Sequence, residues 1–548
     1  MPELAVDIRT PGLADEAGSL VDKFVAERVA SALAWQDPTL WGPQAESEAS
    51  RRLGWVASPE TSRPLLATIE ALRADLHSDG IDRVVLAGMG GSSLAPEVIC
   101  ATAQVPLTVL DTTDPGQVAD ALAGDLERTV LVVSSKSGST VETESHRRVF
   151  AAAFAAAGLD PAAHLVVVTD PGSALQRVAE AEGYRAVITA DPDVGGRYSA
   201  LTAFGLVPAG LAGADIAGLL DDAAQQVPVL AADEPTNPGL RLAAALGTGQ
   251  AAGADKVVLA DTGSGIVGFG DWAEQLIAES TGKDGTGLLP VVVESPGAAG
   301  FVDAAPDAIP VAIGPGIEPA AVAVTGTLGG QFLLWEHAIA VVGRLLGINP
   351  FDQPDVETAK IAARALLNDA TAAEPEPAFV EGPVAVYSVG AWLPAGVATL
   401  ADALRALVAA TPERGYLAVH AYLDRVADAS AAVLRAELAR RGGYARPGRG
   451  GYAPLQTTFG WGPRFLHSTG QYHKGGHQNG SFLQLTGDVE PDILVPGTSF
   501  TLGDLQRAQA LGDAEVLAAR GRPVLRLHLL GRAAGLVQVV RAVQELGP

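Results

Sequence analysis

Five short runs of β-branched and aliphatic residues constrain the fold of this chain more than any other feature. Each run is closed by Gly, Ser, Thr or Asp and is followed by a segment with helical periodicity. A strand that is apolar throughout is covered on both faces, as in a parallel sheet between two layers of helices. The runs therefore predict a doubly wound α/β domain over residues 80–215, with strands at Val84–Ala87, Leu107–Leu110, Val130–Val133, Leu165–Val168 and Ala186–Thr189.

Three further units are expected along the chain. Residues 1–79 predict an N-terminal helical segment, because apolar residues recur at helical spacing over Leu20–Trp35 and Arg63–Leu76. Residues 216–369 predict a second α/β domain, with strands at Lys256–Ala260, Leu289–Val293 and Ile309–Ala312 and helices at Leu240–Gly247, Trp272–Ser280 and Phe332–Leu346. The Ala-, Pro- and Glu-rich stretch Ala370–Pro377 indicates a linker. Residues 370–548 predict a C-terminal α/β segment, with strands at Tyr416–Ala421 and Val524–Leu529 and a helix at Ala429–Arg441.

Charge balance and cysteine content exclude several classes of function. With 37 Lys and Arg against 63 Asp and Glu, the formal charge is −26, which repels nucleic-acid backbones and anionic membranes. The single cysteine, Cys100, has no partner for a disulfide or a cysteine-based metal cluster. Pro319–Trp335 is broken by Gly and Thr and makes a poor membrane span, and Met1–Thr10 has no signal-peptide core. We expect a cytoplasmic protein with no nucleic-acid or membrane partner.

A run of hydroxyls follows the third strand of the first sheet. Ser135-Lys136-Ser137-Gly138-Ser139-Thr140-Val141-Glu142-Thr143 stands between this strand and a helix. Backbone N–H groups and the positive end of the helix dipole would meet the hydroxyls there, which suits a phosphate monoester without a metal. The alternative is an ordinary loop with a Ser or Thr N-cap, but one cap needs only one hydroxyl.

The same domain contains two glycine loops. Gly88-Met-Gly-Gly-Ser92 follows the first strand, and Gly195-Gly196-Arg197 follows the fifth. Ligands of open parallel sheets bind outside the carboxyl ends of the strands, so the loop at Gly88–Ser92 and the hydroxyl run, at adjacent strand ends, converge on one crevice. Arg197 offers fixed, always-charged donors to an oxyanion, although an isolated arginine is more often part of a surface salt bridge.

Later segments add acid, amide and basic side chains. Gln275 and Glu279 lie four residues apart on one helix face, where burial would tune the carboxylate as a base; the alternative is a solvated helix end capped by Gly282. The prolines around Gln353 fix a loop, and Lys360 follows two helical turns later. His467, His473 and His477 suggest a metal site, but Arg464 and Lys474 would repel a cation, so we expect no metal.

Together these motifs resemble the glucose-6-phosphate isomerase family of the sugar-isomerase (SIS) superfamily. The resemblance runs from Val84 to Lys360 through Gly-Met-Gly-Gly-Ser, Ser-Lys-Ser-Gly-Ser-Thr-x-Glu-Thr, Gly-Gly-Arg-Tyr-Ser, Gln-Leu-x-x-Glu-Ser-x-Gly-Lys and Asn-Pro-Phe-Asp-Gln-x-x-Val-Glu-x-x-Lys. The later His-Ser-Thr-Gly-Gln-Tyr-His-Lys-Gly-Gly is similar to a bacterial subgroup related to the isomerase part of transaldolase fusions. The resemblance implies two SIS-like domains and cofactor-free interconversion of glucose 6-phosphate and fructose 6-phosphate through a cis-enediol.

The resemblance also implies roles for individual residues. The phosphate would be held by Ser135, Lys136, Ser137, Thr140 and Thr143, with Ser92 beside the sugar. Glu279 would move the proton between C2 and C1, and Arg197, preceded by Gly196, would stabilise the enediolate. Gln275 and Gln353 would position the substrate. Lys360 would open the sugar ring together with a histidine.

Two positions depart from the family's pattern. Its ring-opening histidine follows a Gly-Gln pair after the base, and no histidine lies between Lys283 and Glu336 here. We therefore expect His473, in Gly470-Gln471-Tyr472-His473, to open the ring, and we expect His337 to be structural. Asp355 stands where the family usually has glycine, so the loop that carries Gln353 departs from the family's pattern.

Other functions stay open at this point. One is the isomerase part of a transaldolase system, and another is a non-catalytic sugar-phosphate sensor on the same fold. A sensor has no need for Arg197, Glu279 and Lys360 together, so their joint presence favours catalysis. Activity on mannose 6-phosphate is also open. The family is typically dimeric, so the resemblance leaves a homodimer open as well.

Overall fold

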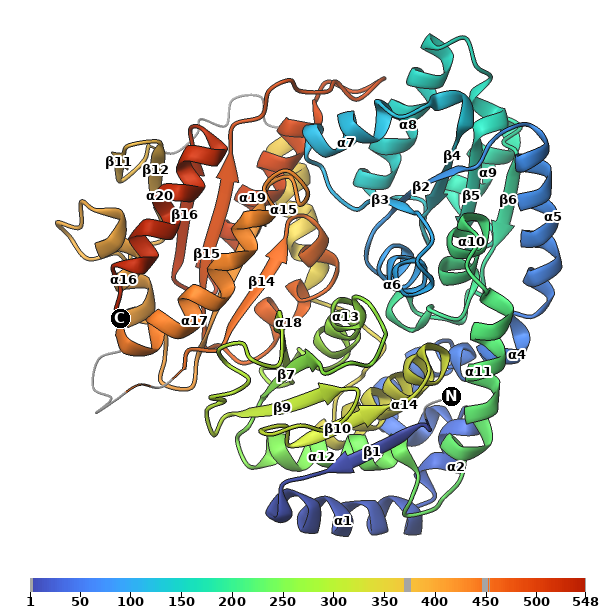
Figure 1. Cartoon of the computed structure of the whole chain (residues 1–548), viewed down its shortest axis with the longest axis horizontal. Coiled ribbons are helices and arrows are strands. Elements are labelled where there is room, and N and C mark those ends of the chain that lie inside the picture. Colours follow the sequence, from blue (N-terminus) through green and yellow to red (C-terminus); the bar gives the residue numbers. More distant parts are fainter. Residues whose placement is uncertain (1–2, 369–375, 446–451, 453, 548) are drawn as a thin grey trace.

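The computed structural model describes residues 3–368, 376–445, 452 and 454–547. It contains three β-sheets with helices packed around them (Figure 1). The predicted linker Ala370–Pro377 lies largely outside the described residues. The predicted class, α/β with mainly parallel sheets, is confirmed.

Among the described residues, the first sheet contains the five predicted strands and no others. Its order is β3 (Thr108–Leu110), β2 (Arg83–Gly88), β4 (Thr129–Ser134), β5 (Leu165–Thr169) and β6 (Ala186–Thr189), and all neighbours are parallel. The intervening helices are α6 (Leu94–Ala103), α7 (Pro115–Leu122), α8 (Val141–Ala156) and α9 (Ala174–Ala181). Gly88 pairs with Ser134 in register, so the loops after β2 and β4 begin side by side.

The second sheet has the order β1-β10-β9-β7-β8. The sequence predicted β7 (Lys256–Asp261), β8 (Leu289–Val292) and β9 (Ala308–Ile313), but it missed β1 (Ala5–Ile8) and β10 (Val322–Thr325). These two short strands pair with each other antiparallel, although more than 300 residues separate them in the sequence. Their pairing depends on a distant partner, which local periodicity cannot reveal. The N-terminal segment is therefore helical apart from this one edge strand.

Further helices cover the second sheet and one side of the first. They are α1 (Pro11–Ala26), α2 (Val29–Ala34), α3 (Pro43–Ala49), α4 (Ser58–Thr61), α5 (Pro64–Ser78), α10 (Ala203–Ala212), α11 (Ile216–Leu230), α12 (Pro238–Ala251), α13 (Phe269–Thr281) and α14 (Leu328–Leu346). One hydrophobic core runs from the N-terminal helices through both α/β units. The domain boundaries at residues 80, 216 and 370 stay predictions. Among the described residues, no helix has the length and apolar character that crossing a membrane requires.

The third sheet has the order β11-β12-β16-β15-β13-β14. Its strands are β11 (Phe379–Glu381), β12 (Val384–Val389), β13 (Tyr416–Tyr422), β14 (Thr457–Trp461), β15 (Gly480–Gly487) and β16 (Val524–Leu529). Strands β13 to β16 pair with one another in parallel. Strand β12 pairs antiparallel with β16 and with the edge strand β11. The helices are α15 (Val356–Asn368), α16 (Leu400–Ala410), α17 (Val433–Ala445), α18 (Gly470–Gly475), α19 (Leu502–Ala519) and α20 (Arg532–Gln544).

The C-terminal unit contacts both of the others where the predicted site residues lie. Helix α18 packs against α13 of the second unit, and the two lie together near the centre of Figure 1. Helix α19 bonds to the loop after β3 and to α8 of the first unit. Side chains from all three units can therefore share one site.

Candidate active site

The hydroxyl loop leaves the N-terminus of α8 open. Thr140 occupies the N-cap position, yet its hydroxyl makes no capping bond and lies 3.2 Å from the hydroxyl of Ser135. Ser137 and Ser139 are exposed, with their hydroxyls 2.8 Å apart. Clustered hydroxyls beside free helix N–H groups form a suitable anion site. The alternative of a simple N-cap is thus not what the structure contains.

Gly138 permits this loop geometry. Its φ is +69°, and an added Cβ would lie 2.6 Å from the backbone nitrogen of Leu175. A side chain would therefore be strained by both the dihedral and the contact. Thr143 follows inside α8, and its buried hydroxyl has no hydrogen-bond partner among the described residues.

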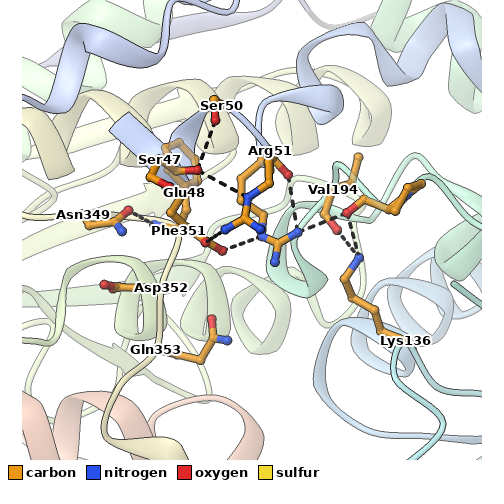
Figure 2. Close-up of polar contacts among 12 residues, drawn as sticks. Ser47, Glu48, Ser50, Arg51, Lys136, Val194, Asn349, Phe351, Asp352 and Gln353 are labelled. Carbon is orange, nitrogen blue, oxygen red and sulfur yellow. Dashed lines mark hydrogen bonds and ion pairs between the residues drawn. The ribbon is translucent and has the colours of Figure 1, made fainter. Parts of the chain in front are cut away.

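Lys136 turns toward a neighbouring loop. Its ammonium lies 2.7 Å from the carboxylate of Asp170 and donates to the carbonyls of Pro192 and Val194. Figure 2 shows this side chain reaching the backbone of Val194. Burial nevertheless holds the pKa of Asp170 above its usual value, against the opposing effect of Lys136. The phosphate role of Lys136 stays a prediction.

The two glycine loops contact each other, which the sequence did not predict. The 3-10 turn Gly90–Ser92 packs against the 3-10 turn Gly196–Tyr198. An added Cβ at Gly91 would come within 1.9 Å of the carbonyl oxygen of Gly196, so only glycine fits. Ser92 is half-buried at the end of the first turn, and the close contact fixes the backbone from which Arg197 projects.

Arg197 is buried and makes several hydrogen bonds, so it is not part of a surface salt bridge. Only 4% of it is exposed. Its guanidinium donates to the carboxylate of Glu279 at 3.0 Å and to the amide oxygen of Gln353 at 3.0 Å. It also donates to the Ser280 hydroxyl and to the carbonyls of Pro350 and Asp352. Five bonds of fixed geometry thus tie the predicted base to the loop that carries Gln353.

Glu279 and Gln275 lie on the buried face of α13. They are 7% and 3% exposed. The amide nitrogen of Gln275 donates to Glu279 at 3.4 Å and to the backbone carbonyl of His467 at 2.9 Å. The amide oxygen of Gln275 is buried without a partner among the described residues. The alternative of a solvated helix end is therefore wrong, because burial surrounds both side chains.

The loop with Gln353 is fastened on two sides. Lys283 donates to the carbonyls of Asn349 and Asp352 and to the Asp352 carboxylate, and burial lowers its pKa to about 8. Asp355 accepts from the amide of Gln471 at 2.9 Å and from Arg520 at 2.7 Å. The departure at Asp355 thus attaches the loop to the C-terminal unit. Figure 2 shows the loop from Asn349 to Gln353.

Lys360 falls on α15, which begins at Val356. Its side chain lies outside the described part of the structure. Its role in ring opening stays a prediction.

His473 lies inside the C-terminal unit. It is 1% exposed, and its Nδ1 lies 2.9 Å from the hydroxyl of Tyr416. Its ring packs with those of His420 and Phe482, and burial lowers its pKa well below the usual value. This enclosed position among aromatic rings does not favour the ring-opening role that the sequence suggested.

A different histidine, His467, lies beside the hydroxyl loop. Its Nε2 is 3.0 Å from the Glu142 carboxylate, and its backbone carbonyl accepts from Gln275. A cavity of about 420 Å³ lies there, with lining residues that include Ser137, Ser139, Thr140, Glu142, His467 and Gln509. The sequence held a signal for this pair, because Glu142 and His467 both stand in family-like motifs.

Two further histidines, His477 and His337, have partners outside this cavity. His477 bonds to Asp255 at 2.5 Å. His337 bonds to the Leu333 carbonyl and packs edge-on against Trp55, as expected of a structural residue. Within the described residues, no group of three or more His, Cys, Asp or Glu is placed to hold a metal.

Comparisons with known proteins agree with the motifs. The phosphoglucose isomerase family model matches residues 72–245. Glucose-6-phosphate isomerase of Acaryochloris marina is 35% identical over 248 residues, which cover 41% of this chain and 47% of that protein. Glucose-6-phosphate isomerase of Thermosynechococcus vestitus is 30% identical over 412 residues, which cover 60% and 77%. The chain thus spans about half the length of the first relative and over three quarters of the second.

The fold also matches a solved structure. A hypothetical protein from Thermus thermophilus aligns with a TM-score of 0.55 and 26% identity. The alignment covers 67% of this chain and 100% of that protein.

Proposed function

This chain belongs to the glucose-6-phosphate isomerase family, and on that premise we propose that it interconverts D-glucose 6-phosphate and D-fructose 6-phosphate through a cis-enediol. The observation that carries the proposal is the buried Arg197–Glu279 pair at 3.0 Å. A buried carboxylate beside a fixed guanidinium is what enolisation of a sugar phosphate needs. The carboxylate takes the proton, and the guanidinium stabilises the oxyanion that develops.

In the proposed step, Glu279 removes the proton from C2 of the open-chain aldose and returns it to C1. Electrons from the broken C–H bond form the enediolate, and the guanidinium of Arg197 stabilises its oxygen. Gln275 and Gln353 lie within hydrogen-bond distance of this pair, which supports their role in orienting the sugar. Arg197 cannot lose its proton near neutral pH, so it stays a donor throughout.

The phosphate would bind at the hydroxyl loop and the N-terminus of α8. Ser137, Ser139 and Thr140 line the adjacent cavity, whose volume of about 420 Å³ is within the range of small-molecule sites. The helix N-terminus favours a dianion although the whole chain carries a formal charge of −26. A net charge that repels polyanions thus coexists with a local anion site.

For ring opening we propose His467 with Glu142 in place of His473. The Glu142 carboxylate lies 3.0 Å from Nε2 of His467, which fixes the ring and supports the imidazolium that forms when the histidine takes a proton. His467 borders the same cavity as the hydroxyl loop. The proton donor would thus come from the C-terminal unit of the same chain. Lys360 keeps its proposed part in this step.

We further propose a reducing cytoplasm as the location. Cys100 is the only cysteine, and burial raises the pKa of its thiol to about 12, so it is not poised for redox chemistry. Homodimerisation stays a prediction.

The experiment is a coupled assay of fructose 6-phosphate conversion with the wild type and with Glu279→Gln. We expect wild-type turnover and a loss of at least about a hundredfold in the variant, with fructose 6-phosphate still bound in calorimetry. Glu274→Gln, which changes the preceding acid on the same helix, is the matched control and should keep the wild-type rate. Binding without turnover in the wild type would instead identify a sugar-phosphate sensor.

A further inference from the structure

One buried face of α19 carries polar side chains. Gln506, Gln509 and Asp513 are 4%, 4% and 0% exposed, and their spacing places them on one side of the helix. Buried polar groups destabilise a fold unless they are hydrogen-bonded. Gln506 donates to Asp114 at 3.3 Å, and Asp513 lies 2.6 Å from the ammonium of Lys474. Each of these two contacts joins structural elements, and neither involves the proposed site.

Gln509 differs from its neighbours in its partner. Its amide nitrogen donates to Oε1 of Glu142 at 2.7 Å. The hydroxyl of Thr113 donates to its amide oxygen at 2.9 Å, which fixes the orientation of the amide. The same Oε1 of Glu142 lies 3.0 Å from Nε2 of His467. One carboxylate oxygen therefore receives both the amide and the histidine.

We propose that Gln509 is a positioning residue for the Glu142–His467 pair: its amide holds the Glu142 carboxylate in place, aimed at His467. The proposal rests on the proposed function. A hydrogen bond to the charged form of a carboxyl favours that form. Fixing the carboxylate in turn fixes the histidine ring, as outer-shell partners do in other sites.

Several titratable or charged groups surround Glu142. They are His467, His146 on its own helix and Tyr422 of β13, and Arg364 lines the same cavity. Removing the Gln509 amide deletes one donor and leaves these groups in place. The Glu142 carboxylate then takes up a proton at higher pH. The acidic limb of the pH profile of kcat/KM should move upward.

The test compares Gln509→Met with Gln506→Met, its matched control on the same helix face. We expect Gln509→Met to lose about tenfold in kcat/KM at neutral pH and to shift the acidic limb by about one pH unit. Gln506→Met should keep the wild-type profile even if its thermal stability falls. In a Glu142→Gln background, Gln509→Met should cause no further loss, because a positioning residue acts through its target.

Two other outcomes would overturn the inference. One is a folded Gln509→Met enzyme with the wild-type rate and profile, and the other is additive losses in the double variant. If Gln509→Met does not fold, Thr113→Val tests the same role. This variant removes the hydrogen bond that orients the Gln509 amide but keeps the amide itself. A smaller shift in the same direction supports the role, and an unchanged profile refutes it. Absence of turnover in the wild type would refute the proposed function instead, which is a distinct result.

Discussion

The first prediction compares substitutions of His467 and His473, two histidines of the same sequence motif. In His467→Gln an amide retains a hydrogen bond to Glu142, which lies 3.0 Å from the native ring, but it cannot carry a proton. General acid–base groups contribute about 10²–10⁴ to the rate. We therefore expect a loss of about 10²-fold or more in kcat on ring-closed glucose 6-phosphate, with little change in stability.

His473→Phe should lower the stability of the protein and leave kcat unchanged, the reverse of what we expect for His467→Gln. The phenyl ring fills the same space, but the hydroxyl of Tyr416, now 2.9 Å from Nδ1, loses its partner. An unsatisfied buried polar group costs about 1–3 kcal/mol, so unfolding should become easier while kcat stays near the wild-type value.

The assay measures initial rates with a coupling dehydrogenase, and thermal unfolding is followed in parallel for each variant. The reasoning fails if His467→Gln keeps more than about a tenth of the wild-type rate, well above the range for a lost acid–base group. It also fails if a folded His473→Phe enzyme is inactive, which would restore the role that the sequence suggested for His473.

Three further predictions concern the site and the core. Arg197→Lys offers three donors where the guanidinium makes five bonds; two lost charged bonds at about 1.5 kcal/mol each predict a loss in kcat/KM of about a hundredfold, measured by steady-state kinetics. Gly91→Ala places a Cβ 1.9 Å from the carbonyl of Gly196, so denaturant unfolding should show a loss of about 2 kcal/mol together with reduced activity. Burial lowers the pKa of His337 from 6.5 to about 4, so the native state binds fewer protons than the unfolded state between these values, and stability is lost as pH falls through this window. In His337→Phe, the fall in unfolding free energy between pH 7 and 4 should be smaller by about 3 kcal/mol, and an unchanged slope would contradict this reasoning.

Much of the site was predictable because its signals are local. Gly196–Arg197, Gln275–Glu279 and the hydroxyl loop each occupy a few consecutive residues, and the family resemblance of these motifs implied that they share one site. Arg197 does meet Glu279 and Gln353. The pattern could not show that Lys136 pairs with Asp170, because that contact depends on how two loops pack.

The sequence by itself determined the first sheet, the succession of α/β elements and the motifs of the candidate site, because strand and helix periodicities are set within a few residues. Only the tertiary structure pairs β1 with β10. It also buries His473 beside Tyr416 and places His467 beside Glu142. Both histidines stand in the same polar motif, so composition cannot separate them. Their surroundings are decided by which elements pack against each side of that segment, and these elements come from distant parts of the chain.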